Sequence, residues 1–531
     1  MHNPRTVSIV RPRPWHRAWP PHLPHTLDYP SVPAWWLLER NLRRFGGRVA
    51  IREVDHETLA EGRVLTYEAL ERAARGAAFG LVDVGVSPGT RVGFCLPNSA
   101  ALVVGYYATW WAGGTIVPAN PLAKVGELEQ QLRDAGVALV VGEPDGPAEA
   151  AARALDVTFL DVGAFEAMEG LRAAPAAPCT PADDVAVVLY TGGTTGTPKG
   201  AMLTHRNVVA NTIQFAEWYA FAPGEETSIA AVPLFSAGGM SGAMNVPLYA
   251  GATLIVFPRF RAAAVAKACG HYGATRLPGV PTMFIALMND AAGRAADYSR
   301  LRACRTNAAP LPPAVKAAFD QLVGREVLVE GYGLTEAGPL THANPLHRVK
   351  PGSIGIPLPD TDARIVDLTT GREVELGESG ELLVRGPQVM KGYWKRPAAT
   401  ENAMPEGWLR TGDVATMDGD GYFAIVDRKK DMINTAGFKV WPAEVEEVLY
   451  AHDAVKLVVV VGVPDDYRGE EVQAFVVLKD EHRASAEELV AHCRARLSAY
   501  KGPRAVEFRT ERPMSGSGRL LRRALRDQTA G

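Results

Sequence analysis

The residues between Tyr190 and Gly200 have the types and spacing that binding of a polyphosphate requires. The segment reads Tyr-Thr-Gly-Gly-Thr-Thr-Gly-Thr-Pro-Lys-Gly, so it combines glycines, hydroxyl side chains and a single lysine. Glycine lets backbone N–H groups turn toward an anion, hydroxyls add donors, and Lys199 supplies a mobile positive charge. The candidate phosphate contacts are Thr191, Gly193, Thr194, Thr195, Gly196, Thr197 and Lys199.

The segment is not a P-loop, because Lys199 follows Pro198 and precedes Gly200, whereas a P-loop lysine lies between Gly and Ser or Thr. An isolated turn rich in Gly and Thr is more often an ordinary surface turn. Here, however, the apolar run 185–190 predicts a strand before the loop, and Thr204 is a candidate N-cap for a helix after it. This setting favours phosphate binding.

A second polar segment is Gly-Tyr-Gly-Leu-Thr-Glu at 331–336. The flat ring of Tyr332 between two glycines can stack on a base. Glu336 beside a hydroxyl can hold a hard cation such as Mg²⁺. Taken alone, the six residues would be interpreted as a tight turn with a solvated carboxylate.

A third cluster runs from 407–413 through 427–431 to 437–446. Asp413 has the chemistry to accept hydrogen bonds from sugar hydroxyls, and Arg428 can donate to them. The alternating charges of Asp-Arg-Lys-Lys-Asp at 427–431 would otherwise indicate a solvated turn.

In this order and spacing, the three segments resemble the adenylate-forming (AMP-binding) superfamily of acyl-CoA synthetases, peptide-synthetase adenylation domains and beetle luciferase. The resemblance covers nearly the whole chain through its phosphate loop, GYGLTE, TGD, DRKKD and GFKVWPAEVEE segments. Other phrases are most similar to medium-chain and long-chain fatty acyl-CoA synthetases. They are RPWH at 13–16, LDYP at 27–30, THANP at 341–345 and KGYW at 391–394.

The resemblance implies specific roles for these residues. Thr191, Thr194, Thr195 and Lys199 would contact the phosphates of ATP, and Glu336 would hold Mg²⁺ together with Thr335 and Thr195. Tyr332, between Gly331 and Gly333, would stack on adenine, whose other edge would face Asn307, Ala308 and Ala309. Asp413 and Arg428 would hold the ribose.

The implied reaction has two steps. A carboxylate attacks a polyanion poorly, so the site must neutralise the phosphates and align the acid oxygen with the α-phosphorus. Pyrophosphate would leave, and an acyl-adenylate would form. A small C-terminal domain would then turn about a hinge at Lys430, bring Gly437 to the site and open a channel for the CoA thiol, which would release AMP.

The C-terminal end departs from the family pattern of Pro-basic-Thr-x-Ser/Thr-Gly-Lys. Residues 513–519 read Pro-Met-Ser-Gly-Ser-Gly-Arg, and no lysine follows Lys501. Arg519 therefore stands where the family places its catalytic lysine, and a wide planar guanidinium is not equivalent to a compact ammonium. We interpret Arg519 as a functional replacement; the alternative is that adenylation is slowed, altered or lost.

A second departure lies in the expected acid pocket, lined by Phe235, Ser236, Gly238, Gly239, Met240 and Gly279. Related synthetases usually have His where Ser236 stands and often an aromatic residue where Gly238 stands. Small residues enlarge the pocket and remove a ring that could gate it. The change suits a long or bulky acyl chain, but it is also compatible with an acceptor other than CoA.

Composition is compatible with a cytoplasmic enzyme of small molecules. The net charge of -3 gives no basic field for nucleic acid. Five cysteines without a close pair indicate neither a disulfide framework nor a zinc site. The N-terminus lacks the apolar core of a secretion signal, and the apolar stretch Ala100 to Ala112 is too short to span a bilayer, so a buried helix is expected. Peripheral membrane contact and a monomer or homodimer remain open.

Alternating helical and strand patterns predict an α/β fold of layered sheets and helices with a small, mobile α+β C-terminal domain. We place the domains at 1–427 and 428–531. The segment 142–181, rich in Ala, Pro and Gly, is expected to wind over the surface. Strands are expected at 456–461 and 471–478, and a helix at 485–497 that opens with a capping box of Ser485 and Glu488.

The predicted function is ligation of a medium-chain or long-chain fatty acid to CoA with ATP and Mg²⁺ as cofactors. One alternative is a ligase that activates an aryl acid or a non-carboxylic acid such as nitrite and passes it to an amine. Another is a nucleotide-binding protein without catalysis, because of Arg519. The first differs by strict dependence on CoA, and the last by ATP binding without ATP–pyrophosphate exchange.

Overall fold

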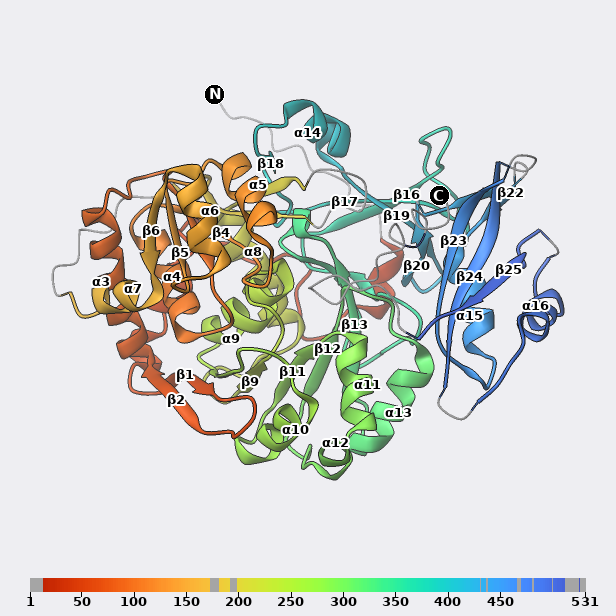
Figure 1. Cartoon of the computed structure of the whole chain (residues 1–531), viewed down its shortest axis with the longest axis horizontal. Coiled ribbons are helices and arrows are strands. Elements are labelled where there is room, and N and C mark those ends of the chain that lie inside the picture. The colour runs from red at the N-terminus through yellow and green to blue at the C-terminus, as the bar shows by residue number, and fades with distance from the viewer. Residues whose placement is uncertain are drawn as a thin grey trace.

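The computed structural model describes residues 13–171, 181–191, 198–429, 431–435, 438–465, 469–479, 482–498, 500–510 and 525. Within these residues the strands form four sheets, called sheets 1 to 4 below (Figure 1). Sheets 1 and 2 are large and mostly parallel, sheet 3 is antiparallel, and sheet 4 belongs to the C-terminal end of the chain. The α/β architecture with a large and a small part agrees with the prediction.

Sheet 1 carries the segment that the sequence assigns to the adenine. Its strand order is β15 (Ile356–Pro357), β14 (Leu340–Ala343), β13 (Leu328–Gly333), β12 (Ala303–Thr306), β11 (Arg276–Gly279), β9 (Thr227–Ala230), β10 (Thr253–Val256), β1 (Val49–Val54) and β2 (Glu61–Thr66). The strands from β13 to β1 run parallel, whereas β14, β15 and β2 are antiparallel additions at the edges. Buried parallel strands explain the near-continuous apolar runs in the sequence.

Sheet 2 carries the phosphate loop between two antiparallel strands near one edge. Its order is β18 (Gly392–Tyr393), β8 (Gly200–Thr204), β7 (Val185–Tyr190), β4 (Thr115–Pro118), β3 (Arg91–Cys95), β5 (Leu139–Gly142) and β6 (Thr158–Asp161). Strand β18 lies far along the chain from β8 but pairs with it, so a late segment is held beside the loop.

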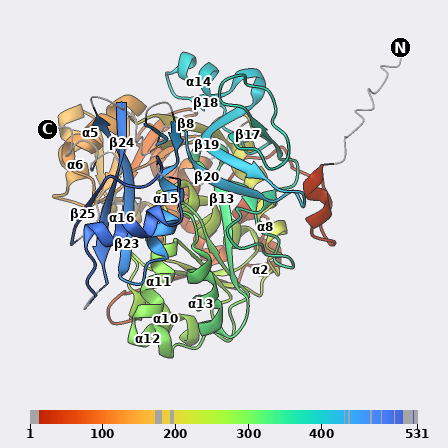
Figure 2. The ribbon, with the colours of Figure 1, turned by 90° about the vertical axis from the view of Figure 1, so that its right-hand side faces the viewer.

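Sheets 3 and 4 follow at the C-terminal side of sheet 1. Sheet 3 has the order β16 (Asp362–Val366), β17 (Gly380–Arg385), β19 (Leu409–Met417) and β20 (Phe423–Arg428). Sheet 4 has the order β22 (Phe438–Val440), β21 (Ile433–Thr435), β24 (Gly469–Leu478) and β23 (Val455–Asp465), with β25 (Ala505–Phe508) paired to β24. In Figure 1 sheet 4 stands at the right, and in the turned view of Figure 2 it lies in front of the N-terminal part.

The helices cover the faces of these sheets, as parallel strands require. In the N-terminal half they are η1 (Pro14–Ala18), α1 (Trp36–Glu39), α2 (Leu42–Phe45), α3 (Tyr67–Asp83), α4 (Ala100–Trp111), α5 (Val125–Ala135), α6 (Pro147–Leu155), α7 (Val162–Met168), α8 (His205–Trp218), the π-helix η2 (Gly239–Asn245) and α9 (Val246–Tyr249). The later ones are α10 (Ala262–His271), α11 (Pro281–Asn289), α12 (Ala291–Ala295), α13 (Pro313–Val323), η3 (Thr335–Ala337), α14 (Pro397–Ala403), η4 (Pro405–Gly407), α15 (Pro442–Tyr450) and α16 (Ala486–Arg494).

Local signals place several helices where the sequence predicts them. The hydroxyl of Thr204 accepts from the backbone N–H of Asn207 and starts α8, directly after the phosphate-loop strands. Ser485 and Glu488 form the expected capping box of α16. Helix α4 is buried along its whole length, which confirms the prediction for the apolar stretch. Among the described residues no helix has both the length and the apolar character needed to cross a bilayer.

The expectation that residues 142–181 wind over the surface is wrong over most of the described part. This segment contains α6, strand β6 of sheet 2, and α7. Ala148, Ala151 and Ala152 are buried and have the spacing of one helix face. The combined Ala, Pro and Gly content predicts a segment on the surface, but the spacing of the alanines indicates a helix.

Four of the cysteines lie among the described residues, and all four are buried. Burial raises the pKa of Cys95 and of Cys269 to about 12 and that of Cys493 to about 11. Burial also raises the pKa of Cys304 well above its usual value. Cys179 lies outside the described residues.

Candidate functional site

The stem of the phosphate loop is an antiparallel pair formed by β7 and β8. Tyr190 is paired with Gly200, and the backbone N–H of Thr191 donates to the carbonyl of Lys199 at 3.0 Å. The loop therefore leaves and re-enters the sheet at neighbouring points, with the Lys199 side chain exposed. The predicted contacts Gly193, Thr194, Thr195, Gly196 and Thr197 lie outside the described residues.

Tyr393 links this stem to the predicted magnesium carboxylate. Its ring lies under the ammonium of Lys199, with 5.1 Å from Nζ to the ring centroid. Its hydroxyl donates to Oε1 of Glu336 at 2.8 Å. Burial, followed by the charge of Glu336, raises the pKa of Tyr393, so the hydroxyl stays protonated and remains a donor. Sequence reasoning missed this role, although KGYW was noted as a family phrase.

Strand pairing explains how Tyr393 comes to lie between the two groups. In β18 Tyr393 is paired with Ala201 of β8, and the N–H of Trp394 donates to the carbonyl of Gly200 at 2.8 Å. The N–H of Met390 donates to the carbonyl of Glu336 at 2.8 Å. The segment 390–394 therefore fixes Lys199 and Glu336 relative to each other.

Thr335 and Glu336 are in η3, immediately after β13, and both are partly exposed. One carboxylate oxygen of Glu336 receives the Tyr393 hydroxyl, which leaves carboxylate lone pairs for a cation. Mg²⁺ is typically held by one or two carboxylates together with substrate phosphates. Within the described ranges no three His, Cys, Asp or Glu residues form a metal cluster. The donor set at Glu336 fits a magnesium ion that arrives with a nucleotide.

A second constellation joins Tyr332, Asp413 and Arg428. The hydroxyl of Tyr332 donates to Oδ2 of Asp413 at 2.5 Å, and Nε of Arg428 lies 3.6 Å from Oδ1 of the same carboxylate. Asp413 and Arg428 are cross-strand partners in β19 and β20. Burial, followed by the charge of Asp413, raises the pKa of the Tyr332 phenol. The structure thus brings together the three residues assigned to adenine and ribose.

The glycines around Tyr332 allow close approach of the backbone. A Cβ atom added to Gly333 would lie 1.7 Å from the carbonyl oxygen of Pro339, so no side chain fits there. A Cβ atom on Gly331 would lie 3.3 Å from the hydroxyl of Tyr219. Position 333 therefore requires glycine because of space, whereas position 331 is tight, which the sequence motif alone does not reveal.

The segment Asn307-Ala308-Ala309 follows β12, beside β13 in sheet 1. Ala308 has a φ of +70°, in the left-handed region that alanine adopts at a cost. Backbone strain of this kind is concentrated at binding sites. A Cβ atom on Gly238 would lie 3.7 Å from Nδ2 of Asn307, so the predicted adenine wall and the predicted acid pocket are adjacent.

Five of the six predicted acid-pocket residues lie in the turn before the π-helix η2 or in its first two positions, and the sixth, Gly279, ends β11. Oγ of Ser236 donates to the carbonyl of Pro233 at 2.7 Å and accepts from the N–H of Gly239 at 3.1 Å. A Cβ atom on Gly239 would lie 1.9 Å from the Pro233 carbonyl oxygen. Met240 is buried and Phe235 is partly buried. A Cβ atom on Gly279 would lie 2.9 Å from the ring of Phe284. Ser236 therefore caps the turn into η2.

Glu330 is a buried carboxyl on β13, directly before Gly331. Burial raises its pKa to about 8, opposed by the N–H of Leu311, which donates to Oε1 at 3.2 Å. Lys316 and Lys350 line the same small cavity, but each is paired with an aspartate, Lys316 with Asp320 and Lys350 with Asp418. A neutral carboxyl is consequently built into the strand that carries Tyr332.

The residues predicted for the hinge, for the second step and for the position of the catalytic lysine lie outside the described part of the chain. These are Lys430, Gly437 and Arg519. Of their neighbours, Arg428 ends β20, and the carboxylate of Asp427 accepts from the backbone N–H of Ala443 at 2.8 Å. The hinge and the Arg519 role stay predictions from the sequence.

Comparison with known proteins gives two consecutive family matches. Residues 38–394 match the family described as AMP-binding enzyme, and residues 444–519 match the AMP-binding enzyme C-terminal domain. The long-chain-fatty-acid–CoA ligase of Bacillus subtilis (strain 168) is 39% identical over 97% of this chain and 98% of that protein. The feruloyl-CoA synthase of Amycolatopsis sp is 39% identical over 88% of this chain and 94% of that protein. The crystal structure of ATP-bound MatB from Rhodopseudomonas palustris is 31% identical, covers 94% of this chain and 99% of that chain, and superposes with a TM-score of 0.86.

Proposed function

The chain belongs to the family of AMP-binding enzymes, and from this premise we propose that it is an ATP-dependent, AMP-forming ligase that joins a medium-chain or long-chain fatty acid to CoA. The name of the Bacillus subtilis relative supports the acid class and the CoA acceptor. The observation that carries the proposal is the arrangement in which Tyr393 ties Lys199 to Glu336. This arrangement puts a cation and a metal-binding carboxylate beside one glycine-rich loop, as a triphosphate requires.

The described residues divide the work of the first step. Lys199 and the Thr191 end of the loop would bind phosphates, while Tyr332, Asp413 and Arg428 would orient the nucleoside. Glu336 would hold Mg²⁺, which when bound supplies positive charge against the phosphates. Tyr393 would keep the carboxylate of Glu336 turned toward the loop through its hydrogen bond. Positioning of this kind lowers the entropic part of the barrier.

The acid would lie along η2 and the end of β12, where Gly238 faces Asn307. Small residues at 236 and 238 leave room at the junction between the adenine wall and the acid pocket. The hydroxyl of Ser236 is engaged with Pro233 and Gly239, so we assign it a structural part rather than proton transfer. The CoA thiol would then attack the carbonyl of the acyl-adenylate and expel AMP.

We also propose the domain boundary at 427/428 with a hinge at Lys430. Sheet 3 ends with Arg428 in β20, and sheet 4 begins with β21. The two family matches, 38–394 and 444–519, lie on either side of this point. Arg428 would place the ribose contact at the edge of the moving part. A cytoplasmic location, a monomeric or homodimeric state and peripheral membrane contact are proposals that rest on the sequence.

The test is acid-dependent release of pyrophosphate with ATP and Mg²⁺, measured for acids of graded length with and without CoA. Thioester and AMP formation that require CoA are expected with at least one fatty acid. Pyrophosphate release without thioester would refute CoA as the acceptor. ATP binding without exchange for every acid would refute ligation and favour a binding protein.

A further inference from the structure

Arg305 is a buried arginine that the nucleotide chemistry above does not use. It lies on β12, and only 7% of the residue is exposed. Its guanidinium stacks over the ring of Phe215, with 4.2 Å from Cζ to the centroid. Among the described residues neither Nε nor Nη1 of Arg305 has a hydrogen-bond partner. A buried cationic side chain thus has donors with nothing to receive them.

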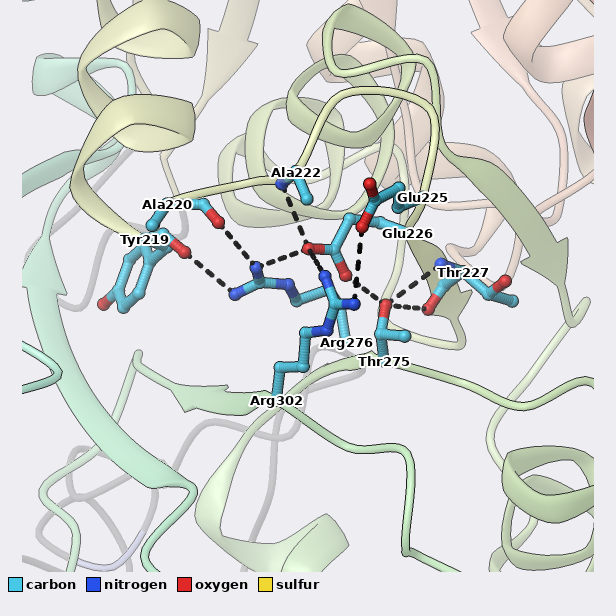
Figure 3. Close-up of polar contacts among 9 residues, drawn as sticks. All are labelled: Tyr219, Ala220, Ala222, Glu225, Glu226, Thr227, Thr275, Arg276 and Arg302. Carbon is cyan, nitrogen blue, oxygen red and sulfur yellow. Dashed lines mark hydrogen bonds and ion pairs between the residues drawn. The ribbon is translucent and has the colours of Figure 1, made fainter.

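A neighbouring arginine on the next strand shows what a compensated site looks like (Figure 3). Arg276 on β11 is equally buried, but its Nη2 lies 2.7 Å from Glu226, and it donates to the carbonyls of Tyr219 and Ala220 at 2.9 and 3.0 Å. Arg302 also reaches Glu226, at 3.2 Å. Arg305 has no such carboxylate among the described residues. Arg276 and Arg305 are therefore buried alike, but only Arg276 has a carboxylate and backbone carbonyls as partners among the described residues.

The charge of Arg305 persists at neutral pH. Burial lowers its pKa to about 10, which is still far above the physiological range. Withdrawing an ionised group from water is unfavourable unless a counter-charge or hydrogen bonds replace the water. The donors Nε and Nη1, which have no partner among the described residues, are the groups with which a guanidinium binds a carboxylate.

The backbone around the guanidinium is shaped to admit it. A Cβ atom on Gly242 would lie 2.2 Å from Nη1 of Arg305, so a side chain at this position would displace the cation. Gly242 lies inside the π-helix η2, and π-helical turns are concentrated at functional sites. The same helix opens with Gly239 and Met240, residues of the predicted acid pocket.

Strand geometry places Arg305 on the acid side of the site. Arg305 lies in β12, and Asn307 is the first residue after this strand, roughly 7 Å farther along the chain. Both side chains approach the η2 segment, because a Cβ atom on Gly242 would clash with Nη1 of Arg305 and one on Gly238 would lie 3.7 Å from Nδ2 of Asn307. Asn307 faces Gly238 at the end of the pocket nearest the nucleotide. Arg305 therefore lies on the same wall, several carbon atoms deeper. Tyr219, whose hydroxyl has no partner among the described residues, lies near it and adds a second donor.

We propose that Arg305 determines acid specificity by binding a second carboxylate at the far end of the substrate, so that the acid is a medium-chain α,ω-dicarboxylic fatty acid. One carboxylate would be activated at the nucleotide, and the other would accept hydrogen bonds from the guanidinium. This inference rests on the proposed ligase function and specifies its substrate. A plain alkyl chain would leave the buried cation unpaired, which selects against monocarboxylic acids of the same length.

The experiment measures kcat/KM for CoA-dependent AMP formation with two series of acids. The series are monocarboxylic and α,ω-dicarboxylic acids of the same chain lengths, from about six to about twelve carbons. This range is chosen around the distance of roughly 7 Å between positions 305 and 307 along the chain, at ~3.3 Å per residue. The wild type is expected to prefer the dicarboxylic acid of one length at least tenfold over its monocarboxylic counterpart. AMP formation on either series supports the ligase function whatever the ratio, and inactivity on all acids would overturn both proposals.

Three variants assign the preference to the guanidinium. Arg305→Met keeps length without charge and is expected to lose at least about thirtyfold on the dicarboxylic acid and to gain on the monocarboxylic one. Arg305→Lys should retain part of the preference, and the exposed Arg300→Met is the matched control, with no change. ATP binding and the melting temperature report whether each variant is folded.

A monocarboxylic preference in the wild type would overturn the proposal without any variant. Equal loss by Arg305→Met on both series would also overturn it, because that pattern indicates a structural arginine satisfied by water. A preference for 4-hydroxycinnamic over cinnamic acid that disappears in Arg305→Met, with no response to the dicarboxylic series, would refute a carboxylate as the distal group.

Discussion

Replacing Glu330 with Gln should remove a loss of folding stability that the wild type shows as the pH rises. The folded pKa of Glu330 is about 8, against 4.5 for an unburied glutamate, because the carboxyl is buried on β13, the strand that also carries Tyr332. The folded state therefore holds a proton that the unfolded state releases. The stabilising contribution is complete below about pH 4.5 and is lost as the pH rises through about 8.

The magnitude follows from proton linkage. Between about pH 5.5 and about pH 7.5 the carboxyl is ionised in the unfolded state but stays mostly protonated in the folded state. Over this interval of about two pH units, ionisation therefore favours the unfolded state by a further amount of about 2.5 kcal/mol. Glutamine preserves the acceptor for the N–H of Leu311 and has no proton to lose. Glu330→Gln should therefore become more stable than the wild type by about 2.5 kcal/mol over this interval.

The assay is urea unfolding monitored by tryptophan fluorescence at both pH values. Glu326→Gln, an exposed glutamate four residues earlier on the chain, is the matched control and should leave the pH dependence unchanged. If the difference in unfolding free energy between Glu330→Gln and the wild type is the same at both pH values, Glu330 is ionised in the folded protein and the reasoning is refuted.

Three further perturbations test the nucleotide site. Tyr393→Phe removes the hydrogen bond to Glu336, worth about 1.5–3 kcal/mol, and should raise the Mg²⁺ concentration for half-maximal pyrophosphate release about tenfold or more. Tyr29→Phe, which removes a similar bond to Asp360, is the control, and an unchanged Mg²⁺ requirement in Tyr393→Phe would contradict the role of Tyr393. Asp413→Asn weakens the pairing with Arg428 and should raise KM for ATP about tenfold, whereas Asp362→Asn in the same sheet should not; equal KM values would exclude Asp413 from the ribose contact. Arg519→Ala should slow adenylation far more than thioester formation from supplied acyl-adenylate, and Arg519→Lys should restore the first step; equal loss in both steps would remove Arg519 from adenylation.

Much of the site could be predicted because its residues belong to compact motifs. Tyr332 and Glu336 occupy one hexapeptide, and Thr191 and Lys199 flank one loop, so their types and spacing are visible in the sequence. The structure brings Tyr332 to Asp413 and Arg428, as the assigned roles require. Local patterns also predicted α4 and the caps of α8 and α16.

What the sequence did not reveal depends on pairing between distant segments. Tyr393 reaches Lys199 only because β18 joins β8 across 190 residues of chain, and no local signal fixes that register. Arg305 has no signal in the sequence, because one arginine in a strand is ordinary until its neighbours Phe215 and Gly242 are known. In 142–181 the composition predicts a surface segment and the helical period predicts a helix, and the prediction from composition is wrong there.

The buried thiols have a consequence for an enzyme whose co-substrate is itself a thiol. Mixed disulfides form through the thiolate, and a cysteine with a pKa of about 12 is ionised to only about one part in 100,000 at neutral pH. Cys95, Cys269, Cys304 and Cys493 are thus poor partners for oxidised CoA. At these four positions the protein can work in a pool of CoA and its disulfide without being capped by its own substrate.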